Sequence, residues 1–386
     1  MNCDQIVIDF QRRFGHEPAC VYFSPGRVNL IGEHTDYNGG NVLPAAIDLG
    51  TCFAVRFNHS SDINIYSDAF DTQQSIRLES VADLKAADQW HDYVAGALQE
   101  YVHLGISGAG LDIYVTGDLP RNSGLSSSAS FTVGLISLLN DLWGAGRQRI
   151  DIVHMARSVE NSFIGLQCGI MDQFAVTMGR ADHCIQLHCE TLEWALVPLI
   201  TDGYELVITD SNVPRKLSES AYNQRRTECN GALLKLRDQF GTGYLCSATM
   251  EDIESCTKLL ESPVELKRAR HVVSENQRVG LSAKALSEAD LVRFGGLMVA
   301  SHNSLRDDFE VSCPQLDLLV ETALEVPGVL GSRMTGAGFG GCTVSLVATA
   351  AVTDYIERVC RVYAVHTPYT ATVIRCRAAD GVRRLS

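Results

Sequence analysis

The sequence predicts an α+β protein with two domains and a ligand cleft where they meet. Its 386 residues allow one large or two medium domains, and strand-like segments alternate with helix-like ones along the chain. The softest boundary lies at residues 201–203, between two sets of such segments. We therefore expect one domain over residues 1–201 and a second over residues 202–386.

The first half is expected to begin with a helix, because Ile6, Val7 and Phe10 have the spacing of an amphipathic helix. The apolar run at residues 28–31 indicates a strand end or a tight buried turn. Alternating apolarity then predicts strands, and helical spacing predicts buried helices. The strands cover residues 51–57, 75–78 and 111–116, and the helices cover residues 131–142 and 152–163.

The second half is expected to open with a strand at residues 206–208, followed by a long stretch rich in helices. That stretch covers residues 218–324 and includes an amphipathic segment at residues 291–303. Two strands with a helix between them complete the pattern. The strands cover residues 343–347 and 371–376, and the helix covers residues 353–362.

Composition narrows the class of protein. With 46% hydrophobic and 20% charged residues the chain has a globular core, and its net charge of −14 argues against a nucleic-acid partner. Neither a signal-peptide core nor an apolar run long enough to span a membrane is present in the sequence. We therefore expect a cytoplasmic protein that binds neither nucleic acid nor membrane.

The 13 cysteines are odd in number and scattered, without a Cys-x-x-Cys pair, as is typical of a reducing cytosol. One cluster combines His183, Cys184, His188 and Cys189. These side chains alternate with apolar ones, so we interpret them as residues of a strand rather than as zinc ligands.

The most informative segment covers residues 26–40 and places an acid, an imidazole, a hydroxyl and a second acid directly after the apolar run. Such mixed hydrogen-bonding capacity suits a polyhydroxylated ligand, whose hydroxyls both donate and accept. The four side chains are Glu33, His34, Thr35 and Asp36, with Arg27 as a fixed positive charge nearby. The alternative is a polar surface loop in which Thr35 and Asp36 cap a helix.

A serine-rich turn links the expected strand at residues 111–116 to the next helix. A turn of small residues onto a helix N-terminus exposes several N–H groups, which attract anions such as phosphate. No lysine follows the glycine, so this is not a Walker P-loop. A capped helix start, with Ser126 or Ser127 as the cap, is the alternative. The phosphate interpretation includes Asn122, Ser123, Gly124, Leu125, Ser126, Ser127 and Ser128.

A glycine-rich block at residues 331–342 matches the dinucleotide-binding pattern at Gly336, Gly338 and Gly341. That pattern should open a helix, whereas residues 342–347 are expected to form a strand. We therefore interpret the whole block as a flexible turn whose backbone approaches a ligand closely.

Two carboxylates complete the candidate site. Glu160 lies late in a predicted helix, and Asp172 is expected to begin the next one. Taken singly, they are a solvated helix residue and a helix cap. Combined with a serine-rich phosphate loop, they supply what phosphoryl transfer needs, a metal ligand and a group that faces the nucleophile.

These blocks resemble the motifs of the galactokinase family, and the resemblance spans nearly the whole chain. The family belongs to the kinase superfamily of galactokinase, homoserine kinase, mevalonate kinase and phosphomevalonate kinase, and the sequence at residues 33–38 is the part that marks galactokinases. The resemblance implies an N-terminal ribosomal-protein-S5-domain-2-like domain and a C-terminal ferredoxin-like domain, with the active site in the cleft between them.

The resemblance also implies roles for single residues. Asp172 would be the catalytic base, with Arg27 beside it, and Trp90 and Tyr93 would lie near adenine. Galactose would be bound by Glu33, His34, Thr35 and Asp36 and by Tyr222 from the second domain. ATP would be bound by residues 122–128, and Mg²⁺ by Ser128 and Glu160.

The sequence departs from the family pattern at Asn122-Ser123, Phe131-Thr132 and Ala221, but each expected catalytic group is present. The leading hypothesis is a monomeric cytosolic kinase that phosphorylates the anomeric hydroxyl of D-galactose with ATP. The alternatives are a non-catalytic sensor of galactose and ATP, and a kinase for another sugar such as N-acetylgalactosamine.

Overall fold

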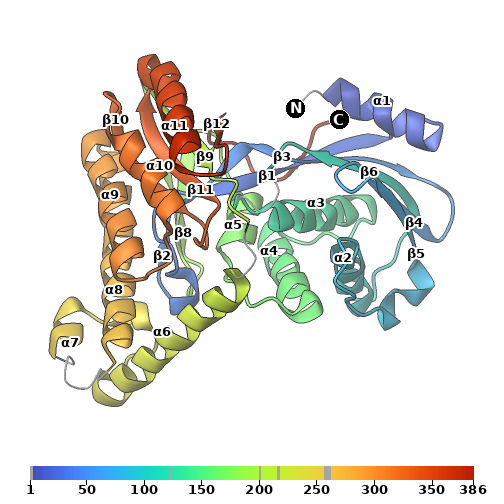
Figure 1. Ribbon diagram of the computed structural model, residues 1–386. Helices are drawn as coiled ribbons and strands as arrows, with labels where there is room; N and C mark the ends of the chain where they lie inside the picture. The colour runs from blue at the N-terminus through green and yellow to red at the C-terminus, as the bar shows by residue number, and fades with distance from the viewer. Residues whose placement is uncertain (1–2, 121–123, 200, 215–217, 256–261) are drawn as a thin grey trace.

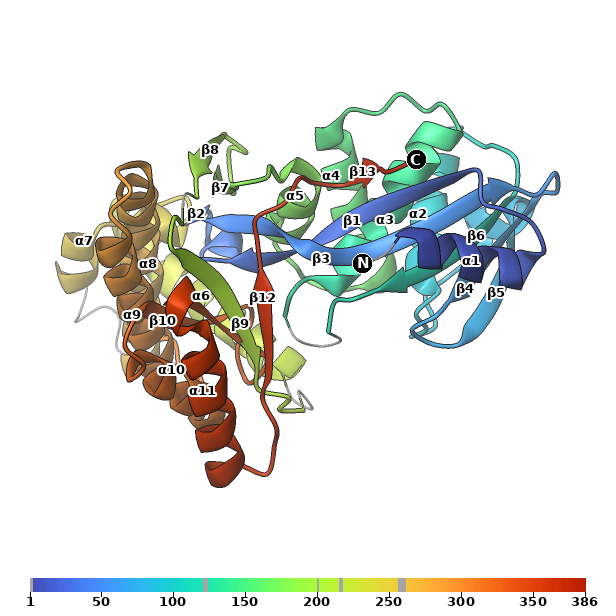
Figure 2. The same ribbon diagram turned by 90° about the horizontal axis from the view of Figure 1, so that it is seen from above.

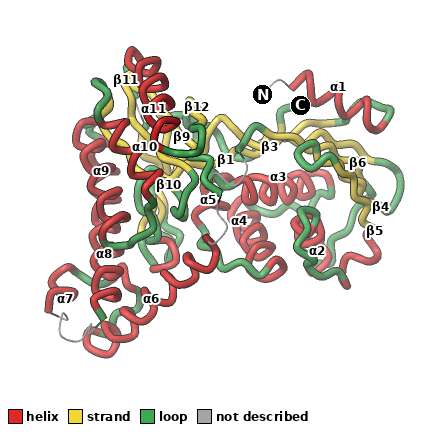
Figure 3. The backbone as a smooth tube through the Cα atoms, viewed as in Figure 1, coloured by secondary structure: helices red, strands yellow, loops and turns green. Residues whose placement is uncertain are grey.

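The computed structural model describes residues 3–120, 124–199, 201–214, 218–255 and 262–386, which form two lobes (Figure 1). Each lobe packs helices against one main sheet, so the expected α+β class with two lobes is confirmed. Figure 3 shows that both lobes contain strands as well as helices. Among the described residues, no helix combines the length and apolarity needed to cross a bilayer.

The first lobe contains a six-stranded sheet in the order β13-β1-β3-β6-β4-β5. Its strands are β1 (Cys20–Asn29), β3 (Pro44–Phe57), β4 (Asp62–Ser67), β5 (Thr72–Arg77), β6 (Leu111–Gly117) and β13 (Arg383–Arg384). Its helices are α1 (Cys3–Phe14), α2 (Asp92–His103), α3 (Ser127–Leu142), α4 (Arg149–Ser158) and α5 (Met171–Met178). Helix α1 covers one face of this sheet and α2–α4 cover the other (Figure 1).

Alternation along β3 explains why both faces of this sheet are covered. Phe53 and Val55 pack into the core with α2 and α3, while Cys52 and Ala54 pack against Ile6 and Phe10 of α1. Because both faces are apolar, each must be buried, and helices provide the cover. Strands β1 and β3 continue past this lobe toward the second one (Figure 2), where residues 28–31 join a different core.

The second lobe contains a four-stranded antiparallel sheet in the order β10-β11-β9-β12. Its strands are β9 (Tyr204–Asp210), β10 (Val329–Thr335), β11 (Cys342–Ala348) and β12 (Thr372–Cys376). Its helices are α6 (Ser218–Phe240), α7 (Met250–Ser255), α8 (Pro263–Ser287), α9 (Leu291–Asp307), α10 (Pro314–Leu324) and α11 (Val352–His366). The first and last strands of the unit pair with each other, as in ferredoxin-like folds.

The same alternation places helices on both faces of this second sheet. Leu206 and Ile208 of β9 pack toward α8 and α9, and Val207 between them packs toward α10 and α11. A small third sheet combines β2 (Asn41–Val42), which stands between β1 and β3 in the chain, with β7 (His183–His188) and β8 (Trp194–Pro198). The strand expected at the His/Cys cluster is confirmed for His183, Cys184 and His188 as β7, whereas Cys189 follows it in a turn.

Most elements expected from the sequence are present, with three corrections. Residues 331–335 are not part of a flexible turn but form most of β10, because Met334 packs into an apolar core; the turn is confined to residues 336–341. The helix expected over residues 152–163 ends as α4, and a π-helical turn, η3 (Val159–Ile164), follows. The strand expected over residues 75–78 runs over Thr72–Arg77 and pairs with β4, for which no strand was expected.

The end of the chain returns to the first lobe. Residues Arg383 and Arg384 pair with β1, and Ala378 bridges to Ile47 of β3. The boundary between residues 201 and 202 falls between β8 and β9 and stays a prediction.

Close packing of α3 on the first sheet generates a stability prediction. A Cβ added at Gly134 would lie 2.3 Å from Cε2 of the buried Phe53 ring. We expect Gly134→Ala to lower the free energy of unfolding by about 1–3 kcal/mol, because the core there has no room for a methyl group. The exposed helical Gly280 of α8 has open space around it, so Gly280→Ala is the matched control. It should raise the free energy of unfolding by ~0.5–1 kcal/mol. Urea unfolding of both variants checks this, and equal effects of the two substitutions would contradict it.

Candidate functional site

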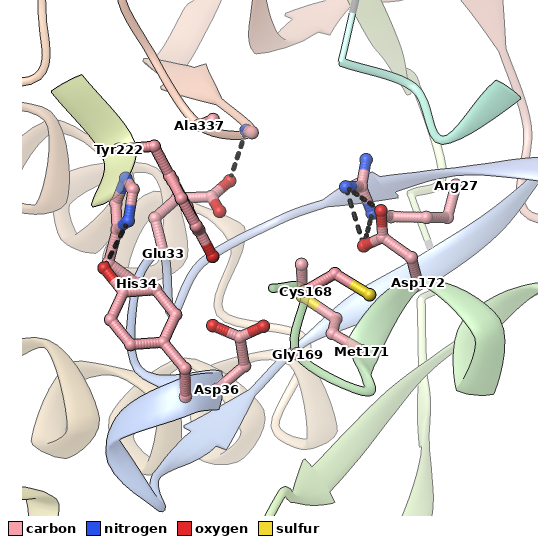
Figure 4. Close-up of a pocket in the computed structure, with 12 residues that line it drawn as sticks. Arg27, Glu33, His34, Asp36, Cys168, Gly169, Met171, Asp172, Tyr222 and Ala337 are labelled. Carbon is pink, nitrogen blue, oxygen red and sulfur yellow. Dashed lines mark hydrogen bonds and ion pairs between the residues drawn. The ribbon is translucent and has the colours of Figure 1, made fainter. Parts of the chain in front are cut away.

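A cavity of about 120 Å³ lies where the two lobes meet (Figure 4). Its walls come from β1, from the loop after it, from the start of α5, from α6 and from the turn between β10 and β11. The lining residues are Arg27, Glu33, His34, Asp36, Tyr37, Cys168, Gly169, Met171, Asp172, Tyr222, Gly336 and Ala337. The structure thus brings together, in one cavity, six of the residues expected from the sequence.

Arg27 and Asp172 form a two-pronged ion pair at one end of this cavity (Figure 4). The guanidinium Nε donates to Oδ1 at 2.8 Å and Nη2 donates to Oδ2 at 2.9 Å. Arg27 is buried in β1, whereas Asp172, in the first turn of α5, is 31% exposed toward the cavity. The pairing fixes the carboxylate plane and leaves Asp172 accessible to a ligand.

Ser126 and Gly124 connect this ion pair to the serine-rich loop. The Ser126 hydroxyl donates to Asp172 Oδ2 at 2.5 Å, and Arg27 Nη1 donates to the carbonyl of Gly124 at 2.6 Å. Ser126 occupies the cap position of α3 with a positive φ of 61°, but its side chain makes no capping bond. The hydroxyl is therefore committed to Asp172 rather than to the helix.

Glu33 is held rigidly from the second lobe. Its Oε1 accepts from the N–H of Gly336 at 2.7 Å, lies 3.1 Å from Thr335 Oγ1, and lies 3.4 Å from Nη2 of the fully buried Arg333. The turn between β10 and β11 therefore reaches this part of the cavity with its backbone, and the close approach to a ligand that the glycine-rich sequence suggested stays a prediction.

His34 is buried and neutral. Its Nδ1 lies 2.8 Å from the Tyr37 hydroxyl, and its ring packs against Tyr222 and Phe309. Burial lowers the pKa of His34 to about 3, and the charges of neighbouring His271 and arginines act in the same direction. Its backbone has a φ of 64°, which is costly for a residue with a side chain and is typical of functional loops.

Thr35 is the one expected sugar-binding residue whose side chain turns away from the cavity. It is fully buried, and its hydroxyl donates to the carbonyls of Gly32 and Asn41 at 2.8 and 2.7 Å. It precedes the short 3₁₀ turn η1 (Asp36–Asn38) without capping it through its side chain. The Thr35 side chain thus joins the two ends of the loop at residues 32 and 41. The alternative in which Thr35 caps a helix through its side chain is not supported.

Asp36 has an unusual electrostatic environment. Burial, together with the negative charge of Asp172 across the cavity, raises its pKa to about 6. A Cβ added at Gly169 would lie 1.7 Å from Asp36 Oδ2, so only glycine leaves room for this carboxylate. The close approach explains why a glycine stands directly before the segment that carries Asp172.

A second, larger cavity of about 880 Å³ lies at the N-terminal end of α3. Ser127 and Ser128 line it, as do the expected adenine neighbours Trp90 and Tyr93. The Trp90 ring stacks on Phe70 with centroids 5.5 Å apart. The structure therefore places the described part of the serine-rich loop beside an aromatic cavity; Asn122 and Ser123 lie outside the described residues.

Glu160 lies in the π-helical turn and is buried, not solvated as the structural alternative supposed. Its Oε1 has no hydrogen-bond partner among the described residues. Burial and the charge of Asp172 raise the pKa of Glu160 to about 7, against the effect of hydrogen bonds from Gln173, Cys168 and Ser128. A buried carboxylate oxygen without a partner beside a serine hydroxyl is a suitable place for a divalent cation.

Comparison with known proteins now identifies the family. A model described as the galactokinase galactose-binding signature matches residues 8–57. Models of the N-terminal and C-terminal domains of GHMP kinases match residues 92–180 and 282–365. A galactokinase of Clostridium acetobutylicum is 44% identical over 380 residues, which cover 98% of this chain and 97% of that protein. The chain belongs to the galactokinase family.

Other galactokinases confirm this assignment. That of Clostridium beijerinckii is 41% identical over 387 residues and covers 100% of this chain and 99% of its own. The crystal structure of Lactococcus lactis galactokinase complexed with galactose superimposes with a TM-score of 0.95 at 38% identity, over 99% of both chains. Mevalonate kinase of Methanococcus jannaschii, at 17% identity and a TM-score of 0.68 over 93% of this chain and 98% of that one, shares the fold.

Several features of this galactokinase-family site were not predicted as site residues from the sequence. The segment that leads into α5 packs closely against Asp36. It therefore adds Cys168, Gly169 and Met171 to the lining of the cavity. Their only sequence signal was proximity to Asp172. Helix α8 also contributes residues that contact the segment after β1. Their signal in the sequence was the presence of charged side chains on what became the buried face of this helix.

The environment of Asp36 generates a prediction that needs no ligand. We expect its carboxyl group, followed by carbon-13 NMR in the unliganded protein, to titrate near pH 6. Asp172→Asn removes a neighbouring negative charge, so the midpoint should move down toward 3.8. Because the folded pKa lies above the unfolded one, this group favours the folded state below about pH 4, and that contribution is lost as pH rises through about 6. Replacement of the exposed Asp380 by Asn is the control and should not move the midpoint. If the titration midpoint of Asp36 were the same in Asp172→Asn as in the wild type, the effect assigned to the charge of Asp172 would be wrong.

Proposed function

We propose that this chain transfers the γ-phosphoryl group of ATP to the anomeric hydroxyl of D-galactose. The observation that carries the proposal is the Arg27–Asp172 ion pair, which lies in the smaller cavity and is joined through Ser126 to the loop that opens on the larger one. A group that faces both a sugar cavity and a phosphate loop is what a sugar kinase needs at its reacting centre.

Galactose is proposed to occupy the smaller cavity. Carboxylates accept hydrogen bonds from sugar hydroxyls, and Glu33 and Asp36 present carboxylates there, while His34 and Tyr222 add aromatic and polar contacts. Thr35 belongs to the same segment, but its hydroxyl bonds to backbone carbonyls, so its proposed role is to hold the shape of the segment. That Lactococcus lactis galactokinase was solved with galactose supports this choice of sugar.

ATP is proposed to occupy the larger cavity, with its phosphates at the N-terminal end of α3. The helix dipole and the N–H groups of residues 124–128 favour negative charge there, and residues 122 and 123 are expected to complete the loop. The aromatic wall around Trp90 and Tyr93 suits a purine ring.

Mg²⁺ is proposed to be held by Ser128 and Glu160. These residues fit a hard cation, because Glu160 offers a buried carboxylate oxygen that no described residue hydrogen-bonds, and Ser128 offers a hydroxyl beside it. When bound, the ion neutralises charge on the phosphates of the nucleotide.

In the proposed reaction, Asp172 accepts a hydrogen bond, and then the proton, from the anomeric hydroxyl as this oxygen attacks the γ-phosphorus. Arg27 orients the Asp172 carboxylate through two hydrogen bonds, and it adds positive charge near the transferred group. Rate acceleration then arises mainly from positioning and from charge stabilisation.

The proposal includes a monomeric protein in the cytosol. The described cysteines form no disulfides, which suits a reducing compartment. The alternatives of a non-catalytic sensor and of a kinase for N-acetylgalactosamine are not favoured, since the full-length relatives are galactokinases and the ion pair is intact. A coupled assay of ADP release with Mg·ATP and galactose tests the activity, and galactose binding without ADP release would indicate the sensor instead.

Replacement of Asp172 by Asn tests its role. We expect kcat to fall by roughly 10²–10⁴-fold, because the amide cannot take a proton, while galactose still binds in a calorimeter. The matched control is Asp380→Asn at an exposed carboxylate away from both cavities, with unchanged turnover. Near-normal kcat in Asp172→Asn would refute the assignment of the base.

Replacement of Glu160 by Gln tests the cation site. We expect the Mg²⁺ concentration for half-maximal rate to rise about tenfold or more, because a neutral amide is a weaker ligand than a carboxylate. The exposed Glu190→Gln is the control and should keep the wild-type requirement. An unchanged Mg²⁺ requirement in Glu160→Gln would exclude Glu160 as a ligand.

A further inference from the structure

Helix α8 of the second lobe contacts the backbone of residues 32–41, which we call the sugar loop. Three polar side chains on one side of the helix, His271, Glu275 and Asn276, each bond to a different point of this loop. Residues four apart on a helix lie on the same face, so His271 and Glu275 act side by side. None of the three lines either cavity.

Glu275 holds the start of the loop. Its carboxylate is fully buried and accepts from the N–H of Gly32 at 2.9 Å and from the Ser301 hydroxyl at 2.6 Å. Arg278 donates to its other oxygen at 2.6 Å. Burial alone would raise the pKa of Glu275, but Arg278, with His271 and Arg333, lowers it to about 2. The buried charge is therefore paired, and it is aimed at a backbone amide of the loop.

His271 holds the next peptide group. Its Nε2 lies 3.2 Å from the carbonyl oxygen of Glu33, and its Nδ1 lies 2.9 Å from the Ser304 hydroxyl. A carbonyl only accepts, so Nε2 carries the proton and the serine donates to Nδ1. Burial lowers the pKa of His271 to about 4, which keeps this arrangement neutral near pH 7.

Asn276 holds the end of the loop. Its Oδ1 accepts from the backbone N–H of Asn41 at 2.8 Å and from the Asn41 side chain at 2.9 Å.

The fit between loop and helix is close, because a Cβ added at Gly32, whose φ is 93°, would lie 2.7 Å from Val279 Cγ2. Glycine is therefore required where the loop rests on α8.

The sugar loop contains three of the residues proposed to bind galactose. His34 is held with a φ of 64°, and a residue in this region persists only where its surroundings over-determine it. The three α8 side chains fix the peptide groups immediately before His34 and the far end of the loop. They add a constraint from the second lobe to the hydrogen bonds that Thr35 makes within the loop.

We propose that His271, Glu275 and Asn276 are positioning residues that hold the sugar loop in its galactose-binding conformation. This inference rests on the proposed function for its effect on galactose, but the clamp itself is a property of the unliganded protein. Without it, the carboxylates of Glu33 and Asp36 lose their fixed relation, and galactose binding weakens more than ATP binding.

The experiment uses paired substitutions in the full chain. Asn276→Ala removes the acceptor and Asn276→Asp keeps it; His271→Leu removes the donor and His271→Gln keeps an N–H. Val273→Ala is the matched control. Val273 lies one turn before Asn276 and is buried in an apolar core, so its truncation removes packing from α8 but no hydrogen bond to the sugar loop. Two quantities are measured: KM for galactose and for ATP, and hydrogen exchange of the sugar loop without ligand.

We expect Asn276→Ala and His271→Leu to raise KM for galactose about tenfold, with KM for ATP within about twofold, and to speed loop exchange about tenfold. Asn276→Asp and His271→Gln should lie near wild type, and Val273→Ala should lower the melting temperature without moving KM. Wild-type exchange and KM in both disruptive variants, or an equal rise of KM in Val273→Ala, would overturn the proposal. If wild-type protein does not turn over galactose, the proposed function fails, and loop exchange alone decides the clamp.

Discussion

The ion pair between Arg27 and Asp172 is the interaction on which the site depends. Arg27 is buried in β1, and an arginine in that position is tolerable only with a partner and with its remaining N–H groups satisfied. Asp172 from α5 and the Gly124 carbonyl from the serine-rich loop meet that need. One guanidinium therefore ties the sheet, the loop and the helix together, and it holds the carboxylate that we propose as the base at the smaller cavity.

Two further carboxyl groups lie near that pair, and bringing their negative charges together costs stability. Asp36 and Glu160 are both held near Asp172, and burial with this shared charge raises the pKa of Asp36 to about 6 and that of Glu160 to about 7. Perturbed groups of this kind cluster where function needs them. The proposed ligands account for the arrangement, since sugar hydroxyls donate to Asp36 and a cation neutralises Glu160.

Local patterns in the sequence predicted most of the elements, because alternation and helical spacing are set by neighbours in the chain. The polar segment after the apolar run pointed to Glu33, His34 and Asp36, whereas Tyr222 came only from the family resemblance. They failed where partners are distant. The polar face of α8 meets a loop about 240 positions earlier, as in the bond between Gly32 and Glu275, and no local pattern encodes that meeting. The π-helical turn that buries Glu160 has the same origin, since a single extra residue in a helix is stabilised by tertiary contacts and leaves little trace in the pattern. The strand β10 was hidden by its glycine and serine content, although Met334 anchors it in a core.

The sugar loop shows why two lobes are needed for one cavity. By sequence it belongs with the first lobe, yet its Gly32 and Asn41 amides and its Glu33 carbonyl bond to α8 of the second. The Glu33 carboxylate in turn is fixed by Arg333 and by the N–H of Gly336. Residues 1–201 alone would leave these buried polar groups without partners, each at a cost of roughly 1–3 kcal/mol. The conformation that presents Glu33, His34 and Asp36 is therefore a property of the contact between lobes, and sugar recognition cannot be assigned to the first lobe by itself.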